Sequence, residues 1–262
     1  MTRIYEEAIL KKIKQEGVLH VSLIDPDPIR QSCEEAGEMA RISASAGTDI
    51  IFIGGSTCFD RVFIDNTILE IRKNTDIPVI LFPGSVSGIS SKADAVLFMS
   101  LLNSTNHYYI AAQQALASFT VKNFGIEAIG TAYLIVEPGS GAGWLGDVKL
   151  LPRNKPEISL GYALAAQYFG FKMIYLEAGS GSNASVPDTI IELIKKNVSI
   201  PIIVGGGIRS KEDVIAKVYA GADLIVQGTV LEESLLRDQG RNLKETIKAL
   251  KFAGKKKLEL PP

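Results

Sequence analysis

The stretch "GTDIIFIGGS" at residues 47–56 has a counterpart, "GFKMIYLEAG", at residues 170–179. Each runs from glycine through a short apolar segment of strand-forming residues to a second glycine. The segments that follow, "RKNTDIPVILFPG" (72–84) and "KKNVSIPIIVGGG" (195–207), align at the same offset. The same sequence of elements therefore occurs in both halves of the chain, which indicates an internal repeat.

Short apolar runs rich in β-branched residues recur along the whole chain, and each ends in Gly, Pro, Ser or Asp, as buried parallel strands do. They cover residues 18–24, 49–54, 78–83, 94–99, 129–136, 173–178, 201–205 and 223–228. Most are separated by segments with helical apolar spacing. A duplicated half of four strand-helix units closes naturally into an eightfold barrel. We predict one α/β domain over residues 1–262, a single (β/α)8 TIM barrel whose third helix is short or irregular, because "GSVSGISSK" is short and glycine-rich.

Several segments carry helix start signals. The patterns "SVPD" (185–188) and "SKED" (210–213) match a capping box. Asp27 followed by Pro28 predicts an N-cap and a first helical residue. Thr57, three residues before Asp60, predicts a cap for the helix after the second strand.

Composition and charge exclude several functions. The chain is 46% hydrophobic and 22% charged, with a formal net charge of −1, so it has no basic field for a nucleic acid. Its N-terminus has no apolar signal segment, and no run is long enough to span a membrane, so we expect a cytoplasmic protein. Cys33 and Cys58 suit a reducing compartment. The C-terminal "GKKKLELPP" is expected to be a solvated helix end, with contact to an anionic membrane surface as the alternative.

Glycine-rich loops follow the last three predicted strands. They read "EAGSGS" (177–182), "GGGIRS" (205–210) and "QGTV" (227–230). Glycine lets backbone N–H groups approach an anion, and the helix behind each loop adds its dipole. Barrel enzymes commonly hold a phosphate after strands seven and eight. The sequence therefore predicts a phosphate site at this part of the rim.

Oxygen ligands end the first two predicted strands. Asp25 and Ser56 lie at neighbouring strand ends, away from the glycine-rich loops. A carboxylate and a hydroxyl, completed by waters and substrate phosphates, commonly hold Mg²⁺. Ser56 is alternatively a helix N-cap, but capping by Thr57 would leave it available for a metal. We therefore predict Mg²⁺ at Asp25 and Ser56.

Other polar residues are candidates for catalysis or for the core. Tyr175 and Glu177 lie on one face of the sixth strand, where Glu177 suits a general base or a residue that orients a hydroxyl. Glu137 ends the fifth strand, but the sequence does not indicate whether its side chain points toward the site. His20 is expected in the core, and His107 either lines a groove or begins a packed helix. With two histidines and no close His/Cys cluster, a zinc site is not expected.

The combination "LIDPDP", "GGS", "LFPGS", "YLEAGSG", "GGGIRS" and "GT" over about residues 18–230 resembles the geranylgeranylglyceryl phosphate synthase family. The resemblance implies transfer of a geranylgeranyl group from its diphosphate to the 3-hydroxyl of sn-glycerol 1-phosphate, with Mg²⁺ on Asp25 and Ser56. It also implies a homo-oligomer, a dimer or a hexamer. It assigns glycerol phosphate binding to Tyr175, Leu176, Glu177, Ala178, Gly179, Ser180, Gly181, Gly206, Gly207, Gly228 and Thr229. The catalytic roles are our own hypothesis from the residues, which places them on Glu177 and Tyr175.

The polyprenyl donor of such an enzyme needs an apolar groove. Candidates for its wall are Phe82, Phe98, Tyr108 and Tyr109, and a short third helix would leave room there. These four residues are alternatively plain core. Versions of the first motif often carry a basic residue where Pro28 stands, so a phosphate contact from this loop is in doubt.

Three other functions fit parts of the pattern. A phosphate-binding isomerase or cyclase would use an acid-base pair, which Asp25 and Glu137 resemble. A barrel that binds a phosphate ligand without catalysis would explain the glycine-rich loops alone. A prenyl-glyceryl phosphate synthase with a longer donor would share every motif, since groove depth sets chain length.

Overall fold

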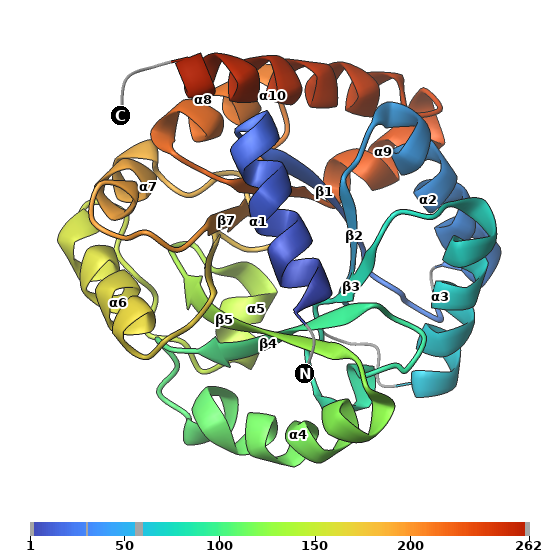
Figure 1. The fold of residues 1–262 in the computed structure, drawn as a ribbon, viewed down its shortest axis with the longest axis horizontal. Coiled ribbons are helices and arrows are strands. Elements are labelled where there is room, and N and C mark those ends of the chain that lie inside the picture. The colour runs from blue at the N-terminus through green and yellow to red at the C-terminus, as the bar shows by residue number, and fades with distance from the viewer. Residues whose placement is uncertain (1–2, 30, 56–59, 260–262) are drawn as a thin grey trace.

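The computed structural model describes residues 3–29, 31–55 and 60–259. Eight parallel strands form a closed barrel in chain order, and the last strand pairs with the first (Figure 1). The strands are β1 (Leu19–Ile24), β2 (Ile50–Ile53), β3 (Val79–Leu81), β4 (Ala95–Leu101), β5 (Glu127–Ile135), β6 (Met173–Glu177), β7 (Ile202–Gly205) and β8 (Leu224–Gln227). The TIM barrel and all eight predicted strands are confirmed.

Side chains alternate between the barrel interior and the surrounding helix layer, as the two-residue period of a strand requires. In β6, Met173 and Tyr175 belong to the interior cluster, whereas Ile174 and Leu176 pack among the helices. All four are buried, because each face of a parallel strand is covered. This alternation decides which side chains of β6 reach the site.

Helices follow the strands around the outside of the barrel (Figure 1). The third connection contains only a 3-10 turn, η1 (Val86–Gly88), so the prediction of a short third helix is confirmed. The helical segments that follow the other strands are α2 (Cys33–Ala46), α3 (Arg61–Asn74), the π-helix η2 (Tyr108–Ala112), α4 (Gln113–Phe124), α5 (Ser140–Leu145), α6 (Pro156–Tyr168), α7 (Asp188–Lys195), α8 (Lys211–Ala220), α9 (Thr229–Arg237) and α10 (Arg241–Glu259).

The predicted starts of the helices are only partly correct. The capping box of α8 is present, with Ser210 accepting from the Asp213 N–H. The one predicted for α7 is wrong, because Pro187 precedes the helix and Asp188 pairs with Lys217 at 2.5 Å instead. The Ser185 carbonyl accepts a hydrogen bond from Arg153.

The helix after β1 begins later than predicted. Ser32 and Glu35 form the capping box of α2, and Asp27 instead accepts from the Ile29 N–H within a turn. The N-cap prediction for Asp27 is therefore wrong. Asp60 is the N-cap of α3, so that helix also begins later than the predicted cap at Thr57, which lies outside the described residues.

A helix that the sequence analysis did not predict, α1 (Ile4–Glu16), lies across the end of the barrel where the strands begin (Figure 1). Ile9 joins the interior cluster, and the Glu127 carboxylate accepts from the Tyr5 and Glu6 N–H groups at 2.8 Å. This contact satisfies backbone donors that a helix start leaves unpaired. Helix α1 thus covers this end of the barrel.

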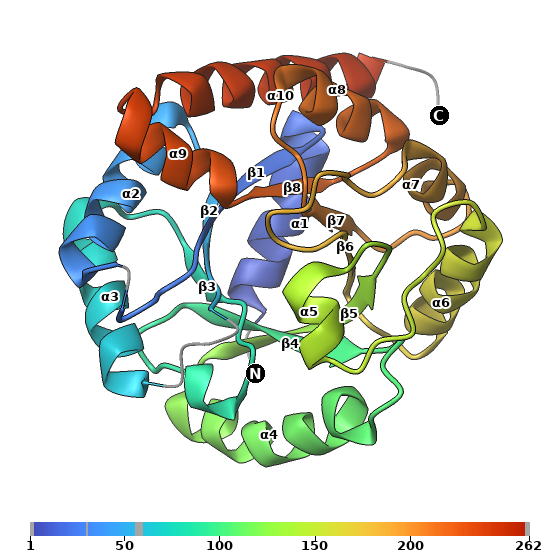
Figure 2. The same cartoon turned by 180° about the vertical axis from the view of Figure 1, so that it is seen from behind.

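The carboxyl ends of the strands face the viewer in Figure 2, where α5 lies over them. The segment after β5 contains this short helix. It is fastened by an antiparallel bridge between Ser104 and Val148. Within the described part of the chain, no helix has the length and apolar character that crossing a membrane requires.

Candidate active site

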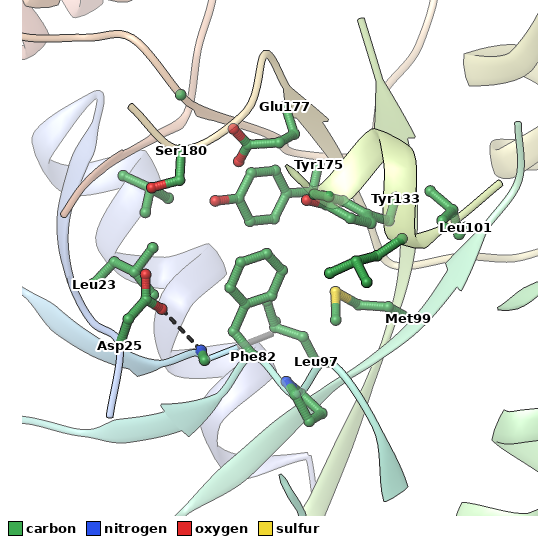
Figure 3. A pocket seen from close by; sticks show the side chains of 18 of the residues that line it. Leu23, Asp25, Phe82, Leu97, Met99, Leu101, Tyr133, Tyr175, Glu177 and Ser180 are labelled. Carbon is green, nitrogen blue, oxygen red and sulfur yellow. Dashed lines mark hydrogen bonds between the residues drawn. The ribbon is translucent and has the colours of Figure 1, made fainter. Parts of the chain in front are cut away.

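A cavity of about 460 Å³ lies among the carboxyl ends of the strands and the loops that follow them. Its position and size are those of a small-molecule site in a TIM barrel. Many of the predicted site residues line it: Asp25, Tyr175, Glu177, Ser180, Gly181, Gly206, Gly207, Gly228 and Thr229. Figure 3 shows Asp25, Ser180 and Glu177 around one part of this cavity and Leu97, Met99 and Leu101 around another.

Glu177 is a buried carboxylate at the end of β6. Its Oε1 accepts a 2.6 Å hydrogen bond from the Gly179 N–H. Burial raises the pKa of Glu177 to about 7, and although the Gly179 N–H opposes this rise, the negative charge of Asp25 adds to it. A carboxyl with such a pKa can accept a proton near neutral pH.

Tyr175 lies beside Glu177 in a cluster of aromatic rings. Its ring stacks on Phe82 with centroids 5.0 Å apart and meets Tyr133 edge to face at 5.3 Å. Burial, above all, and the nearby Glu177 carboxylate raise the pKa of Tyr175 well above its usual value, so its hydroxyl stays protonated. That hydroxyl is buried beside the Glu177 carboxylate, where it helps to hold down the pKa of Glu177, but it makes no hydrogen bond of good geometry among the described residues and can therefore turn to a ligand.

Asp25 follows β1 and points into the same cavity (Figure 3). Its Oδ1 accepts a 2.9 Å hydrogen bond from the Gly55 N–H. A side chain at Gly54 would place its Cβ 2.1 Å from this oxygen, which explains glycine there. Burial, and then the charge of Glu232 on α9, raise the pKa of Asp25 to about 6. A carboxylate with these neighbours would be stabilised by a cation.

The glycine-rich loops lie together along the rim, as predicted. Gly206 has a φ of +80°, and a Cβ there would lie 2.2 Å from Glu177 Oε1 and 2.7 Å from the Gly179 nitrogen. The loop after β7 therefore packs directly against the loop after β6. Thr229 begins α9, so the start of that helix faces the cavity.

Three residues of the predicted binding stretch do not line the cavity. The side chains of Leu176 and Ala178 point into the cluster between barrel and helices, because they alternate with Tyr175 and Glu177. Any contact of these two residues with a ligand would therefore have to come from their backbone, and their binding role stays a prediction. Gly179 instead supports Glu177 from behind through its N–H.

The apolar part of the cavity contains all four predicted wall residues, Phe82, Phe98, Tyr108 and Tyr109. The sequence analysis missed others that also line it, namely Leu97, Met99 and Leu101 on β4, Tyr133 on β5, and Ala142 and Leu145 on α5. The alternation of side chains along β4 could have indicated which of its residues line the cavity. The contribution of α5 could not be predicted in this way, because it depends on how the segment after β5 folds.

Several other polar residues lie outside the catalytic arrangement. Glu137 is exposed and accepts from the Arg153 N–H at 3.2 Å, so it forms no acid-base pair with Asp25. His107 is exposed and does not line the cavity. Ser56, the second predicted metal ligand, lies outside the described residues, as does Cys58. Among the described residues no cluster of three or more His, Cys, Asp or Glu side chains could hold a metal.

His20 is a buried core residue, as predicted. Its Nδ1 lies 2.9 Å from Thr48 Oγ1 and its Nε2 lies 3.1 Å from Gln227 Oε1. Burial lowers the pKa of His20 to about 4, so the ring is neutral. The Gln227 amide in turn donates to the Ile208 carbonyl, which ties the loop after β7 to β8.

Together these features define a class of protein: a TIM barrel with glycine-rich loops at its rim, whose cavity joins a polar, acidic part to an apolar part. Residues 10–250 match the PcrB family model, and the chain belongs to this family.

Named relatives agree with this class. The geranylgeranylglyceryl phosphate synthase of Thermococcus gammatolerans is 49% identical over 92% of this chain and 95% of its own length. That of Methanothermobacter thermautotrophicus is 52% identical over 85% and 89%. The crystal structure of (S)-3-O-geranylgeranylglyceryl phosphate synthase from Thermoplasma acidophilum in complex with sn-glycerol-1-phosphate matches with a TM-score of 0.90 and 41% identity, covering 96% of this chain and all of that one.

Proposed function

We propose that this chain transfers the geranylgeranyl group of geranylgeranyl diphosphate to the 3-hydroxyl of sn-glycerol 1-phosphate, which forms the first ether bond of archaeal membrane phospholipids. The observation that carries the proposal is one cavity in which the Glu177 carboxylate lies beside glycine-rich loops and opens onto an apolar wall. A phosphorylated alcohol and an isoprenoid chain need these two environments in contact. Membership of the PcrB family supports the same reaction.

The reaction forms one carbon–oxygen bond and breaks another. The glycerol 3-oxygen attacks the allylic carbon of the donor, the bond from that carbon to the diphosphate oxygen breaks, and the diphosphate leaves with the electron pair. Glu177 takes the hydroxyl proton, for which its raised pKa suits it. The Tyr175 hydroxyl, which stays protonated and lies beside the Glu177 carboxylate, is placed to donate to an oxygen of the bound alcohol.

We further propose that the enzyme uses Mg²⁺, held by Asp25 with Ser56 as the predicted second ligand. The Asp25 carboxylate suits a hard cation, because it is buried and repelled by Glu232 and Glu177. When bound, Mg²⁺ would neutralise charge on the donor diphosphate. Asp25 itself is held in place by the Gly55 N–H.

The apolar wall would hold the prenyl chain. Phe98, Met99 and Leu101 lie on β4, and Tyr108 and Tyr109 form an edge-to-face pair at 5.2 Å on the π-helix that follows. This surface excludes water from the allylic carbon, so that the glycerol hydroxyl rather than water reaches it. We expect the protein to be cytoplasmic, with the prenyl donor entering from a membrane surface and the ether product leaving to it.

The family resemblance also supports a dimer or a hexamer. Aromatic side chains exposed on the outer surface, among them Phe119 on α4 and Tyr168 and Phe169 at the end of α6, offer apolar surface for such contacts.

A product assay tests the proposed function. Farnesyl, geranylgeranyl and heptaprenyl diphosphates are each mixed with either enantiomer of glycerol phosphate, with Mg²⁺ or with a chelator. We expect the ether product from sn-glycerol 1-phosphate, most rapidly with the geranylgeranyl donor and only with the metal. Fastest turnover with the heptaprenyl donor would instead identify a longer-chain synthase, and no product from any pair would refute prenyl transfer.

A further inference from the structure

Arg209 occupies a particular position among the residues that line the cavity. It lies in the loop after β7, directly behind Gly206, Gly207 and Ile208. Among the described lining residues it is the only side chain with a positive charge, whereas Asp25 and Glu177 bring negative charge to the same cavity. The cavity is therefore poorly matched to an anion unless Arg209 takes part.

Hydrogen bonds fix the backbone and the guanidinium of Arg209 but leave its positive charge without an acidic partner in the described part of the chain. Its backbone N–H donates to Asp213 Oδ2 at 3.2 Å, at the start of α8. Its Nη2 donates to the Gly181 carbonyl at 3.0 Å, in the loop after β6. Within the described residues it forms no ion pair. One N–H of a guanidinium that has five donors thus fastens two glycine-rich loops, and the planar head lies between them.

A phosphate on these loops would meet this guanidinium. Backbone N–H groups of glycine-rich loops supply only partial charges, while a phosphate monoester carries nearly two negative charges. Charge-assisted bonds from arginine are about twice as strong as neutral ones, and its fork matches phosphate oxygens. Because the Asp25 and Glu177 carboxylates would repel a phosphate, a positively charged partner such as Arg209 is all the more necessary.

We propose that Arg209 binds the phosphate of the glycerol phosphate acceptor and makes the site select a phosphorylated alcohol over a neutral one. This inference rests on the proposed function and adds to it a residue that sets acceptor specificity. Arg209 has a second effect, because its bond to Gly181 brings the loops after β6 and β7 into one binding surface.

The test compares full-length variants by calorimetric titration with sn-glycerol 1-phosphate and by steady-state kinetics. Arg209→Gln removes the charge and, because its side chain is two bonds shorter, also gives up the bond to the Gly181 carbonyl, whereas Arg209→Lys keeps the charge. We expect acceptor affinity to fall about 10- to 100-fold, with the KM for acceptor rising alike. The KM for the prenyl diphosphate should stay unchanged. Arg209→Lys should lie between this variant and the wild type.

Lys211→Gln is the matched control, because it removes the same charge two residues away, where Lys211 pairs with Glu245 at 2.7 Å outside the cavity. Its acceptor affinity should equal that of the wild type. If Arg209→Gln binds as Lys211→Gln does, Arg209 only joins the loops and the inference is wrong. A rise confined to the KM of the diphosphate would also overturn it. Failure of the wild type itself to bind the acceptor would refute the proposed function instead.

Discussion

Glu177 is held at the boundary between its two charge states. Asp25, Tyr175 and Tyr133 face it, and none of them carries a positive charge. Burial therefore dominates and raises the pKa of Glu177 from 4.5 to about 7. Because the protonated form is favoured in the folded protein, this group makes folding less stable as pH rises from about 4.5 to about 7, and it becomes an active base over the upper part of that range.

The rate of prenyl transfer should consequently rise with pH up to about 7 and level off above it. Glu177→Gln should lose most of the turnover, on the order of 100-fold or more, and the acid limb of what remains should move from about pH 7 to the lower pH at which Asp25 becomes protonated. Affinity for glycerol phosphate should be largely kept, because the glycine-rich loops are intact. A pH–rate profile and a binding titration check this. Near wild-type turnover in the variant would rule out Glu177 as the base.

Asp25 and Asp27 are two residues apart, but only Asp25 lines the cavity. Asp25→Asn should reduce turnover by roughly a hundredfold, equivalent to about 3 kcal/mol of transition-state stabilisation, with weaker Mg²⁺ dependence. Asp27→Ser should change turnover little, since serine can form a similar turn to Ile29. Mg²⁺ titrations of turnover compare the two. A larger loss of turnover in Asp27→Ser than in Asp25→Asn would show that Asp25 is not the metal ligand.

At the scale of elements, the loop after β7 supports both the anion site and Glu177. Gly206→Ala would place a methyl group 2.2 Å from Glu177 Oε1 at a φ of +80°. We expect a loss of about 1–2 kcal/mol in stability from the backbone alone, and a larger loss of turnover because Glu177 must move. Thermal unfolding and initial rates measure these effects.

Gly161→Ala on the exposed face of α6 is the control for Gly206→Ala. A Cβ there meets nothing within 4 Å, so the substitution should stabilise the protein by about 0.5–1 kcal/mol. Unchanged turnover in Gly206→Ala would show that the packing of the two loops is unimportant for catalysis.

Elements were predicted unequally, for physical reasons. Buried strands such as β6 have an unmistakable apolar composition, so all eight were found. Helix starts depend on which of several competing hydrogen bonds forms: Ser32 rather than Asp27 caps α2, and Asp188 pairs with Lys217. The face of a strand end that lines the cavity is likewise predictable from alternation, which directs Glu177 into the cavity and the side chain of Leu176 toward the helices.

At the scale of the whole molecule, the two ends of the barrel have separate roles. The end covered by α1 contributes stability, and the opposite end carries the site. Contacts such as Glu127 with Tyr5 join residues far apart in sequence, and no local pattern indicates them. The contribution of α5 to the cavity likewise follows from the folded structure and not from any local sequence pattern.

Ile9→Ala in α1 should therefore destabilise the fold by about 2–5 kcal/mol, because it opens a cavity in the barrel interior. The kinetic constants should remain near wild type at temperatures where the variant is folded. Denaturant unfolding and kinetics on the same sample check this. A loss of turnover without a loss of stability would show that the two ends are coupled.

The central claim is that the 3-oxygen of sn-glycerol 1-phosphate attacks the prenyl carbon in this cavity. Its most direct test uses sn-glycerol 1-phosphate labelled with heavy oxygen at the 3-hydroxyl, geranylgeranyl diphosphate and Mg²⁺, with products analysed by mass spectrometry. We predict the label in the ether lipid product and unlabelled diphosphate. Label in the released diphosphate, or no ether product at all, would contradict the account.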